Sequence, residues 1–124
     1  MIKYLKGTSH HRLVFKQVVS TEKVKETDVT SDADWACCPE SHKSTSGYCL
    51  QVMGNLIQSA SKTQSSIALS SAESELYAMC SAISEALYLR NVMEESGISD
   101  GQVIVNLRTD SSACLLYTSP SPRD

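Results

Sequence analysis

Three carboxylates occupy positions that are unusual for solvated charges. Asp32 lies within an alternating apolar segment, Glu75 stands beside an apolar residue in the first turns of an expected helix, and Asp110 ends an otherwise apolar strand. Carboxylates in such places cost free energy unless they are paired, hydrogen-bonded or bound to metal. If the three converged, they would raise one another's pKa values, and divalent cations would relieve the repulsion. An oxygen-only ligand set favours Mg²⁺ or Mn²⁺.

Each of these acids also has an ordinary structural alternative. Asp32 can bond a turn, Glu75 can interact favourably with the helix dipole, and Asp110 can cap a following helix. Asp34 lies on the same strand face as Asp32, because side chains repeat every two residues along a strand. The residues taken alone therefore leave both a metal site and separate structural roles open.

The segments that would position these acids predict an α/β fold in a single domain. The chain has 124 residues, of which 41% are hydrophobic, enough for one core. Apolar alternation predicts strands at 29–36, 45–53 and 56–60, the last two joined by a tight turn at Gly54-Asn55. These would form three antiparallel strands, and residues 103–109 predict a further strand after a long helix.

The long helix has a clear start. Ser70 and Glu73 have the spacing of a capping box, and Gly97 is expected to end the helix. The residues expected to face the core recur at helical spacing: Leu76, Met79, Cys80, Ile83, Leu87 and Met93, with Ala86 and Leu89 widening the stripe. A second helix is expected to begin at 110–113.

The remaining segments are less regular. Residues 1–8 look like the end of a helix, 13–19 predict a strand, 22–28 a charged turn and 39–43 a polar loop. Residues 117–124 contain two Ser-Pro steps without apolar periodicity, and we expect a disordered tail there, which resembles translated adapter sequence.

Composition excludes several classes of protein. No run of 18 apolar residues exists to span a membrane, and residues 1–6 lack the apolar core of a secretory signal. The five cysteines and three histidines lack zinc-site or disulfide-framework spacing, so we expect the cysteines to be small buried hydrophobes in a reducing compartment.

The charge distribution is uneven. The net charge is −3, yet residues 1–16 carry four basic side chains and no acidic one. Such a basic end can meet a phosphate backbone, or can simply be the solvated face of a helix.

Four ordered motifs resemble one known family, the ribonuclease H region of copia-type LTR retrotransposon Pol polyproteins. The motifs are YLKGT at 4–8, SDADWA at 31–36, KSTSGY at 43–48 and ALSSAESELYA at 68–78. The resemblance extends from residue 4 to about 115 and implies a ribonuclease H-like mixed sheet. By this resemblance the first Asp of SDAD is Asp32, the second Glu of AESEL is Glu75, and the Asp of TDS at 109–111 is Asp110.

The resemblance also implies an activity: endonucleolytic hydrolysis of the RNA strand of RNA–DNA hybrids during reverse transcription. Family members use a carboxylate cluster that holds two Mg²⁺ (or Mn²⁺) ions, so Asp32, Glu75 and Asp110 are the expected catalytic and metal-binding residues. Their chemistry makes six further residues candidates for phosphate contacts: Lys43, Ser44, Thr45, Ser46, Lys62 and Thr63. The implied partners are the hybrid and the reverse transcriptase domain of the same polyprotein, in the cytoplasm (within a virus-like particle) or the nucleus.

The sequence also departs from the family pattern. Ribonucleases H carry a fourth acidic residue on a later helix, and nothing in this chain matches it. We therefore expect the C-terminal elements to be missing, and divide the chain into a connection segment with a leading strand (1–28), a truncated ribonuclease H-like domain (29–116) and the tail. The alternatives are a catalytically inert fragment of a decayed element, with at most weak nucleic-acid binding, and a structural module that positions a polymerase.

Overall fold

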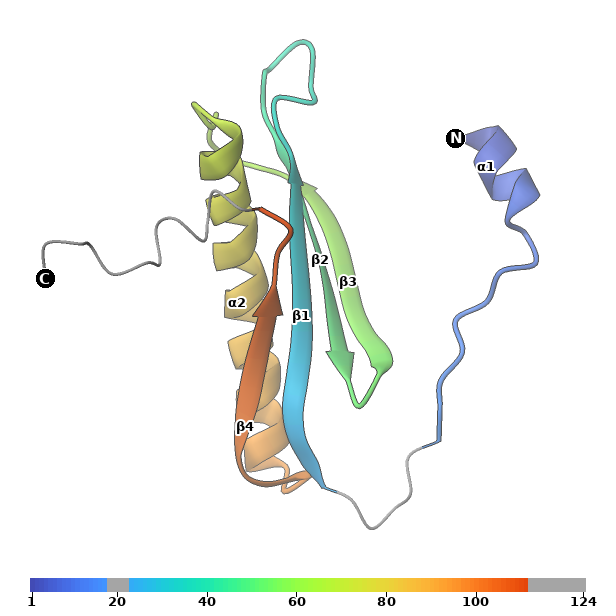
Figure 1. Ribbon diagram of the computed structural model, residues 1–124, viewed down its shortest axis with the longest axis vertical. Helices are drawn as coiled ribbons and strands as arrows, with labels where there is room; N and C mark the ends of the chain where they lie inside the picture. Colours follow the sequence, from blue (N-terminus) through green and yellow to red (C-terminus); the bar gives the residue numbers. More distant parts are fainter. Residues whose placement is uncertain (18–22, 112–124) are drawn as a thin grey trace, which may run out of the picture.

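A four-stranded mixed sheet with one long helix on one face forms the body of the protein (Figure 1). The computed structural model describes residues 1–17 and 23–111. Strands β1 (Val24–Asp34), β2 (Thr45–Val52) and β3 (Asn55–Thr63) are antiparallel neighbours, and β4 (Ser99–Arg108) lies parallel to β1 at the opposite edge from β3. The expected order of three antiparallel strands, a long helix and a further strand is confirmed.

Strand β1 is the centre of the sheet and alternates between its two faces. Thr27, Val29 and Ser31 are buried against the helix, whereas Glu26 and Thr30 lie exposed on the opposite face. Strand β1 begins five residues earlier than expected, so the charged turn assigned to 22–28 is wrong from Val24 onward. The charged residues there are compatible with a strand because the Lys25 and Glu26 side chains are exposed and Asp28 is only half-buried.

The hairpin between β2 and β3 also differs from the expectation by one residue. Met53 and Gly54 form the turn, both with positive φ (50° and 75°), and Asn55 already pairs with Val52. Two consecutive positive φ angles are the conformation of a type I′ turn, whose twist matches that of the flanking strands. Strand β3 then continues three residues beyond the expected end at Ala60.

Helix α2 (Ser71–Glu95) starts where the capping box places it. The Ser70 hydroxyl accepts a hydrogen bond from the Glu73 backbone N–H at 3.1 Å, and the Glu73 carboxylate accepts one from the Leu69 N–H at 2.8 Å. In a capping box the Glu73 side chain would accept from the N–H of the N-cap residue Ser70; here it accepts from Leu69, one residue earlier. At the other end the helix closes at Ser96, followed by Gly97 with a φ of 74°.

The face of α2 that packs on the sheet is not the one expected from the large apolar residues. The buried positions are Ser74, Ala78, Ala82, Ala86 and Met93. They recur mainly every four residues and bring α2 close to Val29 and Leu50 of the sheet. The expected core stripe is therefore wrong at Leu76, Cys80 and Leu87, which are exposed. Ala86 and Met93 are buried as expected, and Met79, Ile83 and Leu89 are half-buried.

The N-terminal segment stands apart from the sheet (Figure 1). Helix α1 (Ile2–Gly7) matches the expected helix end, but 13–17 form no strand, so that expectation is wrong there; 18–22 lie outside the described residues. The Asn55 side-chain amide contacts the end of this segment: its Oδ1 accepts a hydrogen bond from the Lys16 backbone N–H at 2.6 Å, and its Nδ2 donates to the Lys16 carbonyl at 3.1 Å. The expected tail at 117–124 and the helix expected from 110 also extend outside the described part.

Two composition-based expectations can be compared with the structure. Within the described residues no helix is long and apolar enough to cross a membrane. Cys37, Cys49 and Cys80 are exposed and Cys38 is half-buried, so the expectation of buried cysteines is wrong for these four. Cys49 faces outward from β2 and Cys80 from α2, and Cys37 and Cys38 lie in the loop after β1. Single exposed side chains of low polarity cost little.

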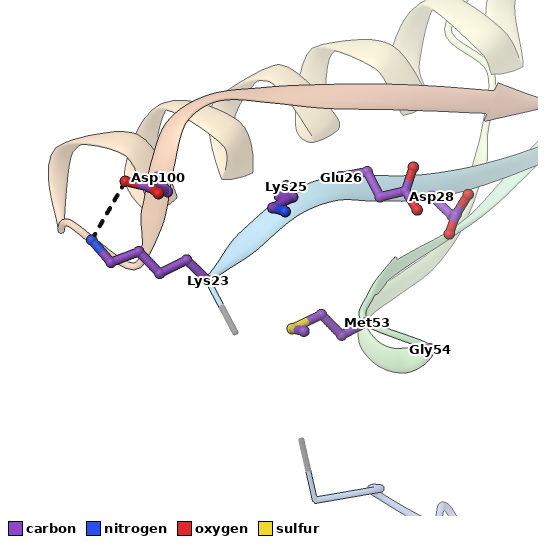
Figure 2. Close-up of a pocket in the computed structure, with 7 residues that line it drawn as sticks. All are labelled: Lys23, Lys25, Glu26, Asp28, Met53, Gly54 and Asp100. Atoms are coloured by element: carbon purple, nitrogen blue, oxygen red, sulfur yellow. Dashed lines mark ion pairs between the residues drawn. The ribbon is translucent and has the colours of Figure 1, made fainter. Parts of the chain in front are cut away.

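A cavity of about 690 Å³ lies at the start of β1 (Figure 2). The cavity is lined by acidic and basic side chains and by the two residues of the β2–β3 turn: Lys23, Lys25, Glu26, Asp28, Met53, Gly54 and Asp100. The Lys23 ammonium pairs with Asp100 at 3.8 Å. Because the cavity opens at the end of β1 opposite to Asp32, it is separate from the acids singled out by the sequence.

Candidate metal centre

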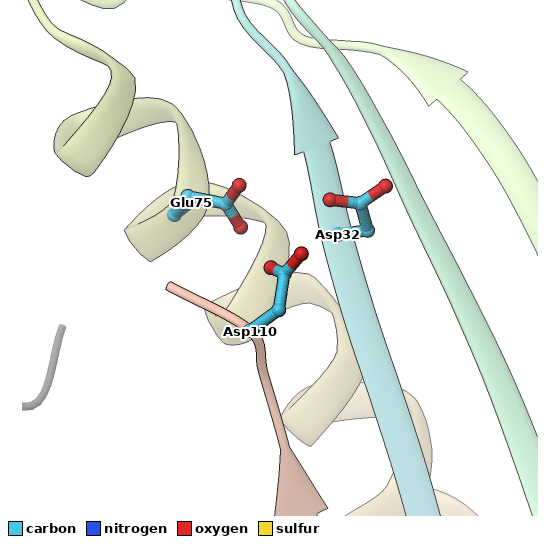
Figure 3. Close-up of side chains that lie close together, drawn as sticks. All are labelled: Asp32, Glu75 and Asp110. Atoms are coloured by element: carbon cyan, nitrogen blue, oxygen red, sulfur yellow. The ribbon is translucent and has the colours of Figure 1, made fainter. Parts of the chain in front are cut away.

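Asp32, Glu75 and Asp110 come from three different elements and converge at one end of the sheet (Figure 3). Asp32 lies near the end of β1, and Asp110 follows the end of β4 by two residues. Because β1 and β4 are parallel, their carboxyl ends meet at the same edge. Glu75 belongs to the first turns of α2, which begins at that edge and packs across the sheet.

The three side chains are close enough to share a cation. One carboxylate oxygen of each residue lies within 4.8 Å of the others. Asp32 and Asp110 are exposed and Glu75 is half-buried, so the group is open to solvent on one side. The donor set consists of oxygens alone, which suits a hard divalent cation.

Hydrogen bonding leaves these oxygens available as ligands. The Ala33 backbone N–H donates to Asp32 Oδ1 at 2.9 Å, which fixes one side of that carboxylate. Glu75 Oε2 is buried and has no hydrogen-bond partner among the described residues. A buried carboxylate oxygen without a donor is costly, and a bound cation would satisfy it.

The pKa of Glu75 also reflects the cost of holding these carboxylates together. Burial raises the pKa of the Glu75 carboxyl above its ordinary value, and the neighbouring Asp32 and Asp110 carboxylates raise it further, while the Ala33 N–H offsets part of this. Like charges held together by the fold are the arrangement that a divalent cation relieves. Asp34, which the strand pattern left as an alternative to Asp32, is not part of this group in the described chain.

The six candidate phosphate contacts divide into two classes. Ser44 and Ser46 are buried and their hydroxyls are engaged inside the protein, with the Ala36 N–H and the Gln64 side-chain amide respectively. Lys62 and Thr63 are exposed at the end of β3, and Lys43 and Thr45 are half-buried. Within this second class the Thr45 hydroxyl is engaged with Cys37 Sγ at 3.0 Å, so Lys43, Lys62 and Thr63 are the ones that offer side chains to a ligand without rearrangement.

Two residues that sequence reasoning missed connect the surroundings of the carboxylates. The Trp35 indole N–H donates to the Ala68 carbonyl at 3.1 Å, which ties the segment after β1 to the segment before α2. The Gln64 amide is buried between β2 and α2. A lone polar residue after a strand gives no sequence signal of such a contact, because the partner is distant in the chain.

Comparison with known proteins finds similarity to parts of transposon Pol polyproteins and to an effector protein. No protein-family model matches it. It is 30% identical over 98 residues to the retrovirus-related Pol polyprotein from transposon RE1 of Arabidopsis thaliana, and 28% over 119 residues to that from transposon TNT 1-94 of Nicotiana tabacum. The chain is therefore similar to a part of these two transposon Pol polyproteins.

The homologous Pol region is a small part of each polyprotein. The alignments cover 79% and 96% of this chain but 6% and 9% of the RE1 and TNT 1-94 polyproteins. A further relative, the secreted RxLR effector protein 161 of Plasmopara viticola, is 38% identical over 89 residues, which cover 72% of this chain and 60% of the effector. The chain thus spans three fifths of that relative and less than a tenth of the polyproteins.

Proposed function

We propose that this Pol-related chain is a ribonuclease H-like domain that hydrolyses the RNA strand of RNA–DNA hybrids. The observation that carries the proposal is the convergence of Asp32, Glu75 and Asp110, whose carboxylate oxygens lie within 4.8 Å of one another. The mixed sheet order β3-β2-β1-β4 with α2 on one face is compatible with that fold. The motifs shared with copia-type Pol polyproteins supply the link to reverse transcription.

In this proposal the three carboxylates hold two Mg²⁺ ions at the carboxyl edge of β1 and β4. Asp32 is oriented by the Ala33 N–H, and Glu75 presents its unpartnered Oε2 from the helix side. Asp110 completes the group from the segment after β4. When bound, the ions would activate a water molecule and stabilise the leaving 3′ oxygen of an in-line displacement at phosphorus.

The remaining surface would hold the nucleic acid by its backbone. Lys62 and Thr63 at the end of β3, with Lys43 two residues before β2, offer an ammonium or hydroxyl group to phosphates. Thr45 at the start of β2 would do so by giving up its contact with Cys37 Sγ. Selectivity for a hybrid needs no contact with base edges, because 2′-hydroxyls and duplex shape distinguish it from DNA. A reverse transcriptase domain of the same polyprotein would supply the hybrid, inside the cell.

The experiment is cleavage of an end-labelled RNA–DNA hybrid by the full chain with Mg²⁺ or Mn²⁺. We expect RNA-strand cleavage by the wild type and none by Asp32→Asn. Asp34→Asn is the matched control: it changes an exposed acid two residues further along the same strand, outside the carboxylate group. It is expected to keep the activity, and RNA-free duplex DNA is expected to stay intact.

Two results would contradict the proposal. A folded wild-type chain that leaves the hybrid intact with both ions would favour the inert-fragment alternative. Equal loss of activity in Asp32→Asn and Asp34→Asn would show that the converging carboxylates are not the source of the activity.

A further inference from the structure

A buried amide connects β2 to the first turns of α2. Gln64, directly after β3, is 8% exposed, and its Nε2 donates hydrogen bonds to Ser46 Oγ and to the Ser74 carbonyl oxygen, both at 2.8 Å. Its own backbone N–H donates to the Ser44 carbonyl at 2.8 Å. The Ser74 carbonyl can only accept, so the nitrogen end of the amide must face it.

Both partners of this amide adjoin the carboxylate group. The Ser74 carbonyl belongs to the peptide unit that leads directly into Glu75, so fixing it fixes the backbone from which the Glu75 side chain projects. On the other side, Ser46 pairs in register with Ala33, the residue after Asp32. Gln64 therefore connects the strand beside Asp32 to the residue before Glu75.

Burying the Gln64 amide at this position costs stability. Gln64 Oε1 is buried without a hydrogen-bond partner among the described residues, and a buried unsatisfied acceptor destabilises a fold. An apolar side chain of similar shape would avoid that cost, but could not hold the Ser74 carbonyl. The hydrogen bond to the Ser74 carbonyl is directional, and it acts on the residue next to Glu75.

We propose that Gln64 is a positioning residue, which holds Glu75 against Asp32 and thereby sets the affinity of the carboxylate group for a divalent cation. This inference rests on the proposed function for its metal, but the hydrogen bonds that carry it are independent of any activity. A misplacement of a ligand by a fraction of an ångström is enough to weaken a metal site, because the geometry of all ligands must be met together.

The chain offers a matched control in a second glutamine, on the strand that precedes Gln64. Gln58 of β3 donates to the Tyr48 hydroxyl at 2.9 Å and to Glu85 Oε2 at 3.4 Å. Like Gln64, it bridges β2 and α2. Glu85 is further along the helix than Glu75 by roughly 15 Å, at about 1.5 Å rise per residue. Its loss should affect stability without affecting the carboxylates.

The test measures Mn²⁺ binding to the full chain by calorimetry without nucleic acid, for wild type, Gln64→Met and Gln58→Met. Methionine keeps the length of the side chain and removes the amide. We expect Gln64→Met to weaken Mn²⁺ binding about tenfold, in the range seen when the supporting contacts of metal ligands are removed. Gln58→Met should leave the Mn²⁺ affinity unchanged.

Amide hydrogen exchange gives a readout that needs no metal. In Gln64→Met, exchange in the first turns of α2 should become faster, whereas the C-terminal half of α2 should keep its wild-type rates. Unchanged Mn²⁺ affinity and exchange in Gln64→Met would overturn the inference. Equal weakening of Mn²⁺ binding by both variants would also overturn it, because Gln64 would then act only through general stability.

Two further outcomes remain decisive. If Gln64→Met does not fold, Ser46→Ala, which removes one acceptor of the amide, takes its place with a smaller effect of the same sign. If the wild type neither binds Mn²⁺ nor cleaves hybrid, the proposed function fails. Local exchange then decides the positioning role alone: faster exchange confined to the first turns of α2 supports it, and unchanged exchange overturns it.

Discussion

Glu75 is a candidate metal ligand whose position lowers the stability of the metal-free fold. Its carboxyl has a raised pKa because it is partly buried and faces two other carboxylates. Between the ordinary pKa near 4.5 and the raised value, the folded chain binds more protons than the unfolded chain. The free energy of unfolding therefore falls as the pH rises through this window, and the full cost is present above it.

For the metal-free chain, we expect the Glu75→Gln variant to lose this part of the pH dependence. Urea unfolding at a series of pH values from about 4 to 8 would show a shallower fall in stability than for the wild type. Glu95→Gln, which changes an exposed glutamate at the other end of α2, is the control and should retain the wild-type slope. The same slope in Glu75→Gln and wild type would contradict the assigned cause.

At the scale of elements, α2 is packed by its smallest side chains. Ala78, Ala82 and Ala86 are fully buried against the sheet, whereas Leu76 is 51% and Leu87 is 37% exposed. Small residues let the helix axis approach the strands closely, which brings Glu75 within reach of Asp32 and Asp110. The larger apolar residues then lie along the flank of the helix, where they remain partly open to solvent.

This packing predicts that enlarging a buried alanine of α2 destabilises the fold more than truncating one of its exposed leucines. Ala82→Leu should lower the free energy of unfolding by about 1–3 kcal/mol, because no space exists for the added atoms. Leu87→Ala should change it by about 0.5 kcal/mol or less, since Leu87 is exposed and the two residues have similar helix propensity. Urea unfolding measures both. A cost of about 2–5 kcal/mol for Leu87→Ala would instead restore the stripe expected from the sequence.

At the scale of the whole molecule, charge opposes the proposed partner. The net charge is −3, and a nucleic-acid duplex is strongly negative. Any affinity for a hybrid must therefore come from local basic side chains and from bound cations. Lys62 is exposed at the end of β3, while Lys25 is exposed on β1 near the opposite end of the sheet.

We expect Lys62→Ala to reduce the salt dependence of hybrid binding, with the slope of log affinity against log salt falling by about one. Fluorescence anisotropy of a labelled hybrid measures this, in an Asp32→Asn background that prevents cleavage. Lys25→Ala serves as the control and should leave the slope unchanged. Equal slopes for Lys62→Ala and the Asp32→Asn parent would remove Lys62 from the binding surface.

Local sequence signals determined the order of the elements, and the family motifs singled out the three acids. Ser70 and Glu73 predict the helix start because capping involves residues three positions apart, and the hairpin signal near Gly54 depends on neighbouring backbone angles. Asp32, Glu75 and Asp110 were recognisable because each carboxylate stands in an apolar context next to a motif of known families. The residues of the helix cap and of the turn are close in the chain, whereas the three acids are far apart and were singled out through the family motifs.

The tertiary structure alone decided which face of α2 is buried, where β1 begins and what holds Glu75 in place. A helix with large apolar residues on one flank and alanines on another offers two faces, and only the fit against Val29 and Leu50 selects the alanines. Gln64 has no local signal, because its partners Ser46 and Ser74 are eighteen and ten residues away. Packing and buried hydrogen bonds depend on distances in space, which periodicity along the chain does not encode.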